Sequence, residues 1–410
     1  MADQKQSNIL SWLKGLGPGL IIAALVFGPS KMTITSKLGA NYGFSLLWII
    51  VVAIFFMVIF TNMSARIGYA TQQSLLSSIK TRWGKGAGIV IGIGIFLVCT
   101  SFQAGNSVGV GVALGELTHT ANTPWIIAFN VISIALLFFR AFYKVLEWLM
   151  IALIGLMLLS FIVTVFMINP DLGQTATGFI PSIPEGSQGL VIAFMASCFS
   201  IVGAFYQSYL VQERRRIRQL QPNQPEPKRR SDSVTGIIIL GFMSAIVLIC
   251  AAAILHPRNI TVNTASDMSV ALEPLFGSYA SGLFLIGLFG ASFSSIIGNA
   301  GVGGLLLGDA LGYGNNFSSK SIRLFIALVM LAGATIAIAF GKLPLELIVF
   351  AQSVTIFIVP VVGISMYLIA NDEKIMGKDK NSPFVKVAGA VGLLVVLALA
   401  IINFKDLFIK

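Results

Sequence analysis

Residues 17–43, GPGLIIAALVFGPSKMTITSKLGANYG, place a lysine inside an apolar run long enough to cross a membrane. The run is interrupted at Gly28-Pro29-Ser30, directly before Lys31, because proline cannot donate the hydrogen bond that a helix interior requires. A charged side chain at the centre of a membrane helix costs about 2.5 to 3.5 kcal/mol on insertion scales. A charge retained at that cost beside a broken helix predicts a functional site at Gly28, Pro29, Ser30 and Lys31.

The composition is typical of a membrane protein with many spans. Of 410 residues, 56% are hydrophobic and only 10% are charged, and the mean hydropathy is +0.89. Such a chain has too little polar surface to cover a soluble globule. We therefore expect an all-α membrane protein forming a single domain over residues 1–410. Apolar runs of about 20 residues predict eleven membrane-spanning helices, at 17–40, 45–68, 86–116, 124–140, 144–168, 188–212, 234–256, 272–308, 321–341, 346–370 and 384–404.

The distribution of charge predicts topology and partners. The net charge is +11, and most Lys and Arg residues lie in alternate loops, beginning with Lys14 and including segment 214–230. The positive-inside rule then predicts a cytoplasmic N-terminus and an external C-terminus. We expect segment 214–230 to lie on anionic lipid at the cytoplasmic face of a bacterial plasma membrane. Because lipid accounts for the basic charge, no nucleic-acid partner is expected.

The reactive side chains argue against several kinds of site. Cys99, Cys198 and Cys250 fall within predicted spans without the spacing of metal ligands, and His119 and His256 lie at span ends. No nucleophile, base and orienting group fall together along the chain. We therefore expect neither an enzyme, nor a bound cofactor, nor a metal site built from these residues.

The sixth predicted span carries a second candidate interruption. It includes SCFSIVGAFYQS, residues 197–208, with Gly203 near its centre, five spans after the break at Pro29. Interruptions at corresponding positions in two halves are typical of inverted repeats that hold a substrate near mid-membrane, although a glycine in a membrane helix is also a common packing residue. The expected repeats cover about 17–168 and 188–370, followed by an extra helix at about 384–404.

Three motifs together resemble one transporter family. GPGLIIAALVFGPSKMTITSKLGANYGFSLLW is similar to the first helix of the Nramp metal-ion transporters, EPLFGSYASGLFLIGLFGASFSSIIGNAGVG to their eighth and AQSVTIFIVPVVG to their tenth. The resemblance runs in order through nearly the whole chain. It implies the LeuT fold, with two inverted five-helix repeats plus one C-terminal helix, and secondary transport by alternating access.

The sequence departs from that family where the family binds metal. The family's Asp-Pro-Gly-Asn, whose aspartate and asparagine bind the ion, corresponds to Gly28 and Lys31 around a retained Pro29. The Met-Pro-His of its sixth helix corresponds to residues 200–202, which begin with Ser200. The resemblance therefore implies a substrate site at the same place without the usual metal ligands.

Other polar positions follow the same resemblance. The family's acidic proton-path residues of the third helix fall on Gln103 and Asn106, and a second histidine of the sixth helix falls on Gln207. The glutamine of the tenth helix is retained as Gln352. The resemblance thus implies that Gln352, Gly203 and the residues of the first break bind the substrate. It also implies that three further side chains line a vestibule or bind the coupling ion: Gln103, Asn106 and Gln207.

Three interpretations of Lys31 are open. First, a protonated Lys31 beside half-helix N-termini would form an anion site. Second, a neutral Lys31 could load and release a proton or replace a coupling cation. Third, the side chain could snorkel or cap the carbonyls of the broken helix. A dication about 4 Å from an ammonium would be repelled by about 8 kcal/mol at an effective dielectric constant of about 20.

We therefore predict a transporter that has lost manganese and iron transport and carries a small anion or a carboxylate-bearing solute. One alternative is a divalent metal transporter that uses backbone carbonyls and Gln352. Another is a non-transporting membrane sensor or scaffold that docks a partner through segment 214–230.

Overall fold

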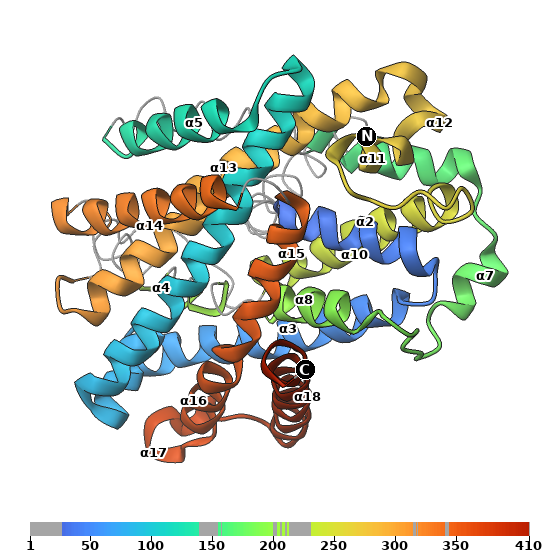
Figure 1. The fold of residues 1–410 in the computed structure, drawn as a ribbon. Helices are drawn as coiled ribbons and strands as arrows, with labels where there is room; N and C mark the ends of the chain where they lie inside the picture. The colour runs from blue at the N-terminus through green and yellow to red at the C-terminus, as the bar shows by residue number, and fades with distance from the viewer. Residues whose placement is uncertain are drawn as a thin grey trace, which may run out of the picture.

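The computed structural model is helical in all its regular elements over the residues that it describes (Figure 1). These residues are 27–138, 155–156, 158–199, 203–205, 207–209, 211–212, 231–314, 317, 319–340 and 344–409. Among them, seven helices are long and apolar enough to cross a membrane, and a bent pair makes an eighth. An all-helical membrane protein is thereby confirmed. The number of eleven spans remains a prediction, because several predicted spans lie partly outside the described residues.

Helix α2, Pro29–Tyr42, begins at the predicted break. Gly28 precedes it in an extended conformation, with φ −83° and ψ −175°, and Pro29 occupies the first helical position. Proline suits that position because the first N–H of a helix has no intrahelical partner to lose. The chain turns at Gly43, where φ is 59°, before α3, Leu47–Thr71.

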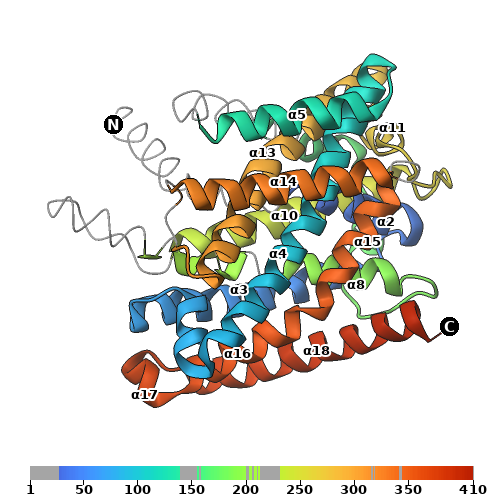
Figure 2. The same cartoon turned by 60° about the vertical axis from the view of Figure 1, so that its left-hand side comes forward.

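Two long helices cross through the centre of the molecule (Figures 1 and 2). They are α4, Leu75–Thr118, and α13, Ala280–Ala310. Small residues allow the close approach: a methyl group on Gly92 would lie 2.2 Å from Cβ of Ala310. Since packing between membrane helices depends on such close backbone contact, α4 and α13 form a rigid pair. Two further helices pack on this pair, α5, Asn122–Leu136, and α14, Lys320–Ala339.

The sixth predicted span is interrupted, but before Gly203. Its first half is α8, Gln188–Cys198, which ends at Phe199, and the chain is helical again at 203–205. The sequence-based expectation of a break centred on Gly203 is therefore displaced by about one turn, and Gly203 belongs to the second half-helix. Ser200 lies outside the described residues.

The tenth predicted span, 346–370, contains a bend that the sequence analysis did not anticipate. Helices α15, Pro344–Val354, and α16, Val359–Asn371, are bent by 43° across a 3-10 turn. Pro360 follows the turn and cannot donate a hydrogen bond back to it, which explains the bend. Helix α18, Pro383–Phe408, lies beside α16 on the outside of the bundle (Figure 2).

The remaining helices connect or cover this bundle. Helix α10, Ser231–Ile254, packs along α2. Residues 158–168 form a shorter apolar helix. The short helices between the spans are α7, Leu172–Thr177, α11, Ala265–Ser269, α12, Glu273–Phe276, and α17, Glu373–Met376.

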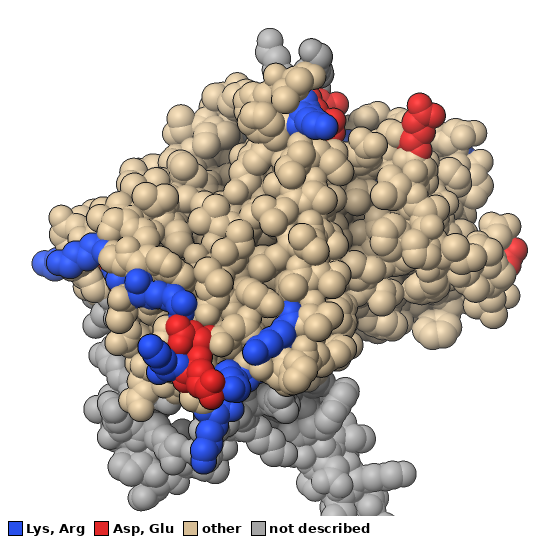
Figure 3. Space-filling model, turned by 90° about the horizontal axis from the view of Figure 1, so that it is seen from below, with Lys and Arg blue, Asp and Glu red and all other residues tan. Residues whose placement is uncertain are grey.

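Lys and Arg gather at one end of the bundle, shown from below in Figure 3, where they surround a few acidic side chains. Three of these basic residues form ion pairs: Lys80 with Asp309 at 2.9 Å, Arg82 with Asp372 at 2.5 Å and Lys380 with Glu373 at 3.0 Å. We call this end the basic face. Its residues lie at the beginnings of α4, α14 and α18 and just after α16, and include Lys80, Arg82, Lys85, Lys320, Arg323, Lys374, Lys378, Lys380 and Lys386.

Candidate functional site

Lys31 lies in the first turn of α2 and is only 1% exposed. Its Nζ donates a hydrogen bond to Ser197 Oγ at 2.7 Å and another to Cys198 Sγ. The same Nζ lies 4.0 Å from the centre of the Phe194 ring. All three partners belong to the last turns of α8, so the Lys31 side chain crosses from the beginning of one half-helix to the end of the other.

Helix electrostatics explain this direction. A positive charge is unfavourable at the N-terminal end of a helix and favourable at the C-terminal end. Lys31 therefore places its ammonium away from the start of α2 and against the end of α8. The Phe194 ring face attracts the ammonium further, and Ser197 Oγ accepts from it while donating to Phe194 O at 2.6 Å. The partners of the ammonium are side chains of α8, and none of them is a carbonyl of the broken first helix.

No acidic side chain of α2 lies at the start of this helix. Gly28 offers no side chain to cap the helix, and the first turn contains no acidic residue. Pro29 has no N–H, and the N–H groups of Lys31 and Met32 already bond to Gly28 O at 3.1 Å and 3.3 Å, so the first turn offers Ser30 N–H as its remaining donor among the described residues. The positive end of the helix dipole adds to the attraction for negative charge there. The beginning of α2 can therefore receive a negatively charged or carbonyl oxygen from a ligand.

Two polar side chains face Gly28 from the central helix pair. A methyl group on Gly28 would lie 2.9 Å from Ser295 Oγ of α13 and 3.5 Å from Asn106 Oδ1 of α4. Ser295 is 2% exposed, and its Oγ has no hydrogen-bond partner among the described residues. Ser30 Oγ lies close by, 3.1 Å from a methyl group built on Gly105. We call Gly28, Ser30, Asn106 and Ser295 the break cluster.

The sequence analysis did not select Ser295. It lies within ASFSSIIGNAG, where paired serines interrupt an otherwise apolar span. Hydroxyl groups in such spans commonly bond within the helix, as Ser292 Oγ does to Leu288 O at 2.6 Å. The unpartnered state of Ser295 is visible only in the structure.

The predicted vestibule residues do not share one environment. Gln103 packs against Gly333 of α14, whereas Asn106 faces Gly28; Ser107, the next residue of α4, bonds to Asn130 of α5 at 3.0 Å. Asn106 alone of the three reaches the break cluster. The difference arises because α4 is surrounded by helices, so a small rotation around its axis leads to another neighbour.

Two predicted site residues lie on other elements. Gln352 of α15 is 4% exposed, and its Oε1 has no hydrogen-bond partner among the described residues. Gln207 is 5% exposed within the helical second half of the sixth span. Both are buried polar groups, as a role in an internal site requires. The basic segment 214–230 lies outside the described residues.

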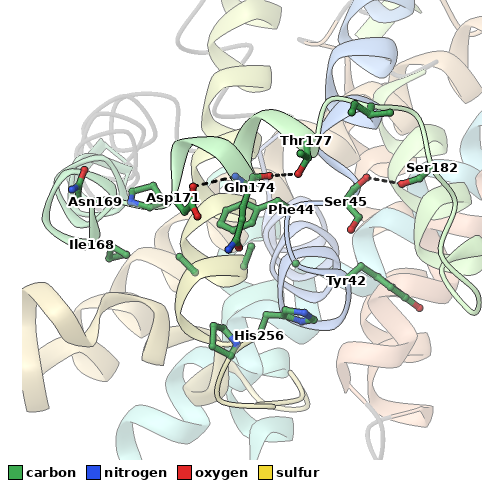
Figure 4. Close-up of a pocket in the computed structure, with 16 residues that line it drawn as sticks. Tyr42, Phe44, Ser45, Ile168, Asn169, Asp171, Gln174, Thr177, Ser182 and His256 are labelled. Carbon is green, nitrogen blue, oxygen red and sulfur yellow. Dashed lines mark hydrogen bonds between the residues drawn. The ribbon is translucent and has the colours of Figure 1, made fainter.

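A separate pocket lies between the end of α2 and the segment that leads into α7 (Figure 4). It has a volume of about 710 Å³ and is lined by residues that include Tyr42, Asp171 and His256. Its main polar groups already have structural roles: Asp171 accepts from Gly173 N at 2.8 Å to cap α7, and His256 Nδ1 lies 2.8 Å from Ala40 O. We therefore do not assign the substrate to it.

The chemistry of the break cluster is neutral or positive. Among the described residues there is no group of three or more His, Cys, Asp or Glu side chains that could hold a metal ion. Hydroxyl, amide and backbone N–H groups surround the start of α2, and the Lys31 ammonium lies against the end of α8. These groups can bind a small polar or anionic molecule.

Comparison with known proteins supplies the family. The model of the family described as natural resistance-associated macrophage protein-like, Nramp, matches residues 19–405. The chain belongs to the Nramp family. It is 27% identical over 397 residues to the divalent metal cation transporter MntH of Deinococcus radiodurans, covering 94% of this chain and 88% of that protein.

Solved structures place this Nramp protein in the LeuT fold. The manganese transporter of Eremococcus coleocola matches with a TM-score of 0.78 at 18% identity, over 96% of this chain and 86% of the other. A nucleobase-cation-symport-1 family transporter matches with a TM-score of 0.58 at 13% identity, over 96% and 93%. The expected fold and family are therefore confirmed, and the protein is an integral membrane transporter.

Proposed function

We propose that this Nramp-family transporter works by alternating access and carries a small anion or a carboxylate-bearing solute, bound at the break cluster. The observation that carries the proposal is the uncapped start of α2, which faces the unpartnered hydroxyl of buried Ser295. A helix start and a hydroxyl both donate hydrogen bonds to an anion. Half-helix starts that point at anionic substrate groups are a recurring feature of transporters with inverted repeats.

Electrostatics favours this substrate over a divalent cation. At about 4 Å and an effective dielectric constant of about 20, the Lys31 ammonium would repel a dication by about 8 kcal/mol. Divalent ions normally recover such energy from carboxylate, imidazole or sulfur ligands, and the described residues contain no cluster of these. The same charge attracts an anion.

A divalent metal ion is the second candidate. The Deinococcus radiodurans relative, which matches over nearly the whole chain, is named a divalent metal cation transporter. Buried Gln352 has an unpartnered Oε1 that could serve as a neutral oxygen ligand. Metal transport would then depend on Gln352 and on backbone carbonyls.

Binding and uptake by purified protein distinguish the two candidates. Calorimetry is carried out with chloride, phosphate, acetate and an α-amino acid. We expect at least one of these solutes to bind the wild-type protein. The same solute should bind Lys31→Met at least about tenfold more weakly, which corresponds to about 1.4 kcal/mol. Lys37→Met, on the same helix, is the matched control and should bind like wild type. Manganese should give neither heat nor uptake into liposomes. Manganese uptake that is lost in Gln352→Leu would establish the second candidate and overturn the first.

We also propose the orientation and the repeat organisation. The basic face lies in the cytoplasm against anionic lipid of a bacterial plasma membrane, as its charge suggests. The repeats extend over about 17–168 and 188–370. Labelling of engineered cysteines from one side of sealed vesicles tests the orientation: a cysteine at Lys85 should react only from inside, and one at Tyr279 only from outside.

A further inference from the structure

The second half of the sixth span is fastened to the scaffold at the basic face through one carboxylate. Tyr209 Oη donates to Asp309 Oδ2 at the end of α13. Lys80 Nζ of α4 lies 2.9 Å from Asp309 Oδ1 and also donates to Asp309 O. Ser74 Oγ completes the set at 3.3 Å from Asp309 Oδ2. We call Ser74, Lys80, Tyr209 and Asp309 the Asp309 cluster.

Three of the four members of the cluster are buried, which makes their contacts sensitive to movement. Asp309 is 8% exposed, Tyr209 6% and Ser74 2%. Hydrogen bonds to an ionised acceptor are shorter and stronger than neutral ones, and low local dielectric strengthens them further. A displacement of Tyr209 would break such a bond, so the cluster favours one position of the sixth span.

Further hydrogen bonds continue along the same half-helix. Ser208 Oγ accepts from Leu75 N at 3.1 Å, and Ser64 Oγ donates to Ala204 O. Gln212 Nε2 donates to carbonyls at the end of α3 and beyond it, at 3.1 Å and 3.0 Å. The second half of the sixth span is therefore held along its length against the turn between α3 and α4.

The two halves of the interrupted span have different attachments. Lys31 joins the end of the first half, α8, to α2. Asp309 joins the second half to α4 and α13. Because helical geometry ends at Phe199, where ψ is 29°, between these two attachments, the second half can move while α8 remains bound to α2.

We infer that the Asp309 cluster is a latch that keeps the basic-face side of the transporter closed, with Tyr209 as its moving part. Lys80 and Asp309 lie on α4 and α13, which are tightly packed, so their ion pair survives when the latch opens. Asp309 then keeps one charged partner and gains water, and only the contacts of the sixth span are lost. The latch is therefore reversible. This inference rests on the proposed alternating access but not on the identity of the substrate.

Hydrogen–deuterium exchange of the full chain in lipid nanodiscs, without substrate, tests the latch. Tyr209→Phe keeps the ring and removes only the hydroxyl. Losing a hydrogen bond to a charged acceptor is expected to speed exchange by about tenfold or more at Leu75 and across 203–212. Asp309→Asn should have the same effect. Glu273→Gln, which breaks an exposed ion pair with Arg258 at the opposite end, is the matched control and should leave that exchange unchanged.

Two results would overturn the latch. One is unchanged exchange at Leu75 and 203–212 in Tyr209→Phe; the other is an equal increase throughout α13 and α14, which would indicate general destabilisation. If exchange rises locally while no tested solute is bound or transported, the latch stands and the proposed substrate fails. If an anion is bound at the break cluster while exchange is unchanged, the substrate stands and the latch fails.

Discussion

Gly28→Ala provides a direct test of the break cluster, because it adds a single methyl group where a ligand should lie. The backbone at Gly28, with φ −83° and ψ −175°, is accessible to any residue, so alanine introduces no strain there. The new Cβ would lie 2.9 Å from Ser295 Oγ, about 0.5 Å inside ordinary contact distance. Ser295 Oγ has no hydrogen bond to lose and can rotate away.

The expected effect on stability is small, and the effect on function is large. Alanine restricts the unfolded chain relative to glycine, which contributes about 0.4 to 1 kcal/mol of stability. It is also a poorer N-cap than glycine by a similar amount, so the net change is small. The melting temperature should remain within about 3 °C of wild type. The methyl group denies a bound anion its hydrogen bond from the helix start, worth about 1.5 to 3 kcal/mol. Affinity should therefore fall about 10- to 100-fold.

The assay pairs thermal unfolding with calorimetry on the anion identified for wild type. Gly189→Ala is the matched control, since a methyl group there would meet nothing within 4 Å and should change neither measurement. Wild-type affinity in Gly28→Ala would show that the ligand does not lie at the start of α2. A large loss of stability would show instead that Gly28 is required for packing.

Two further substitutions test the surrounding structure by thermal unfolding. Gly39→Ala should destabilise the protein by about 1 to 3 kcal/mol. Its methyl group would lie 2.4 Å from Leu248 O, a backbone atom of α10 that cannot rotate away. Unchanged stability would contradict that close packing. Gln103→Met should raise stability by about 1 kcal/mol or more, since both amide atoms of Gln103 lack partners among the described residues. A fall would show that Gln103 holds a buried water or ligand.

The sequence predicted the local features well because they depend on local physics. An apolar run of sufficient length must form a helix in a membrane, and Pro29 within such a run indicates a new helix start. The bend between α15 and α16 was missed although Pro360 is visible in the sequence, since proline also occurs in continuous membrane helices. The displaced interruption near Gly203 has a similar cause, because a glycine marks either a break or a packing contact.

Contacts between distant residues could not be predicted in the same way. Gln103 and Asn106 were both expected at a vestibule, but Gln103 contacts α14 whereas Asn106 faces Gly28 before α2. Likewise, nothing near Tyr209 in the sequence indicates that its hydroxyl meets Asp309, 100 residues later. Such pairings depend on how whole helices pack.

The resemblance to the Nramp family implied a transporter, and the residues by themselves determined a polytopic membrane protein with a helix that restarts at Pro29 and a lysine beside that restart. These properties follow from apolar length, proline geometry and the cost of a charge in the membrane. Only the tertiary structure decided where the charge goes. The Lys31 ammonium meets Ser197, 166 positions away, at the end of α8, where the helix dipole favours a cation. That choice leaves the start of α2 open beside Ser295.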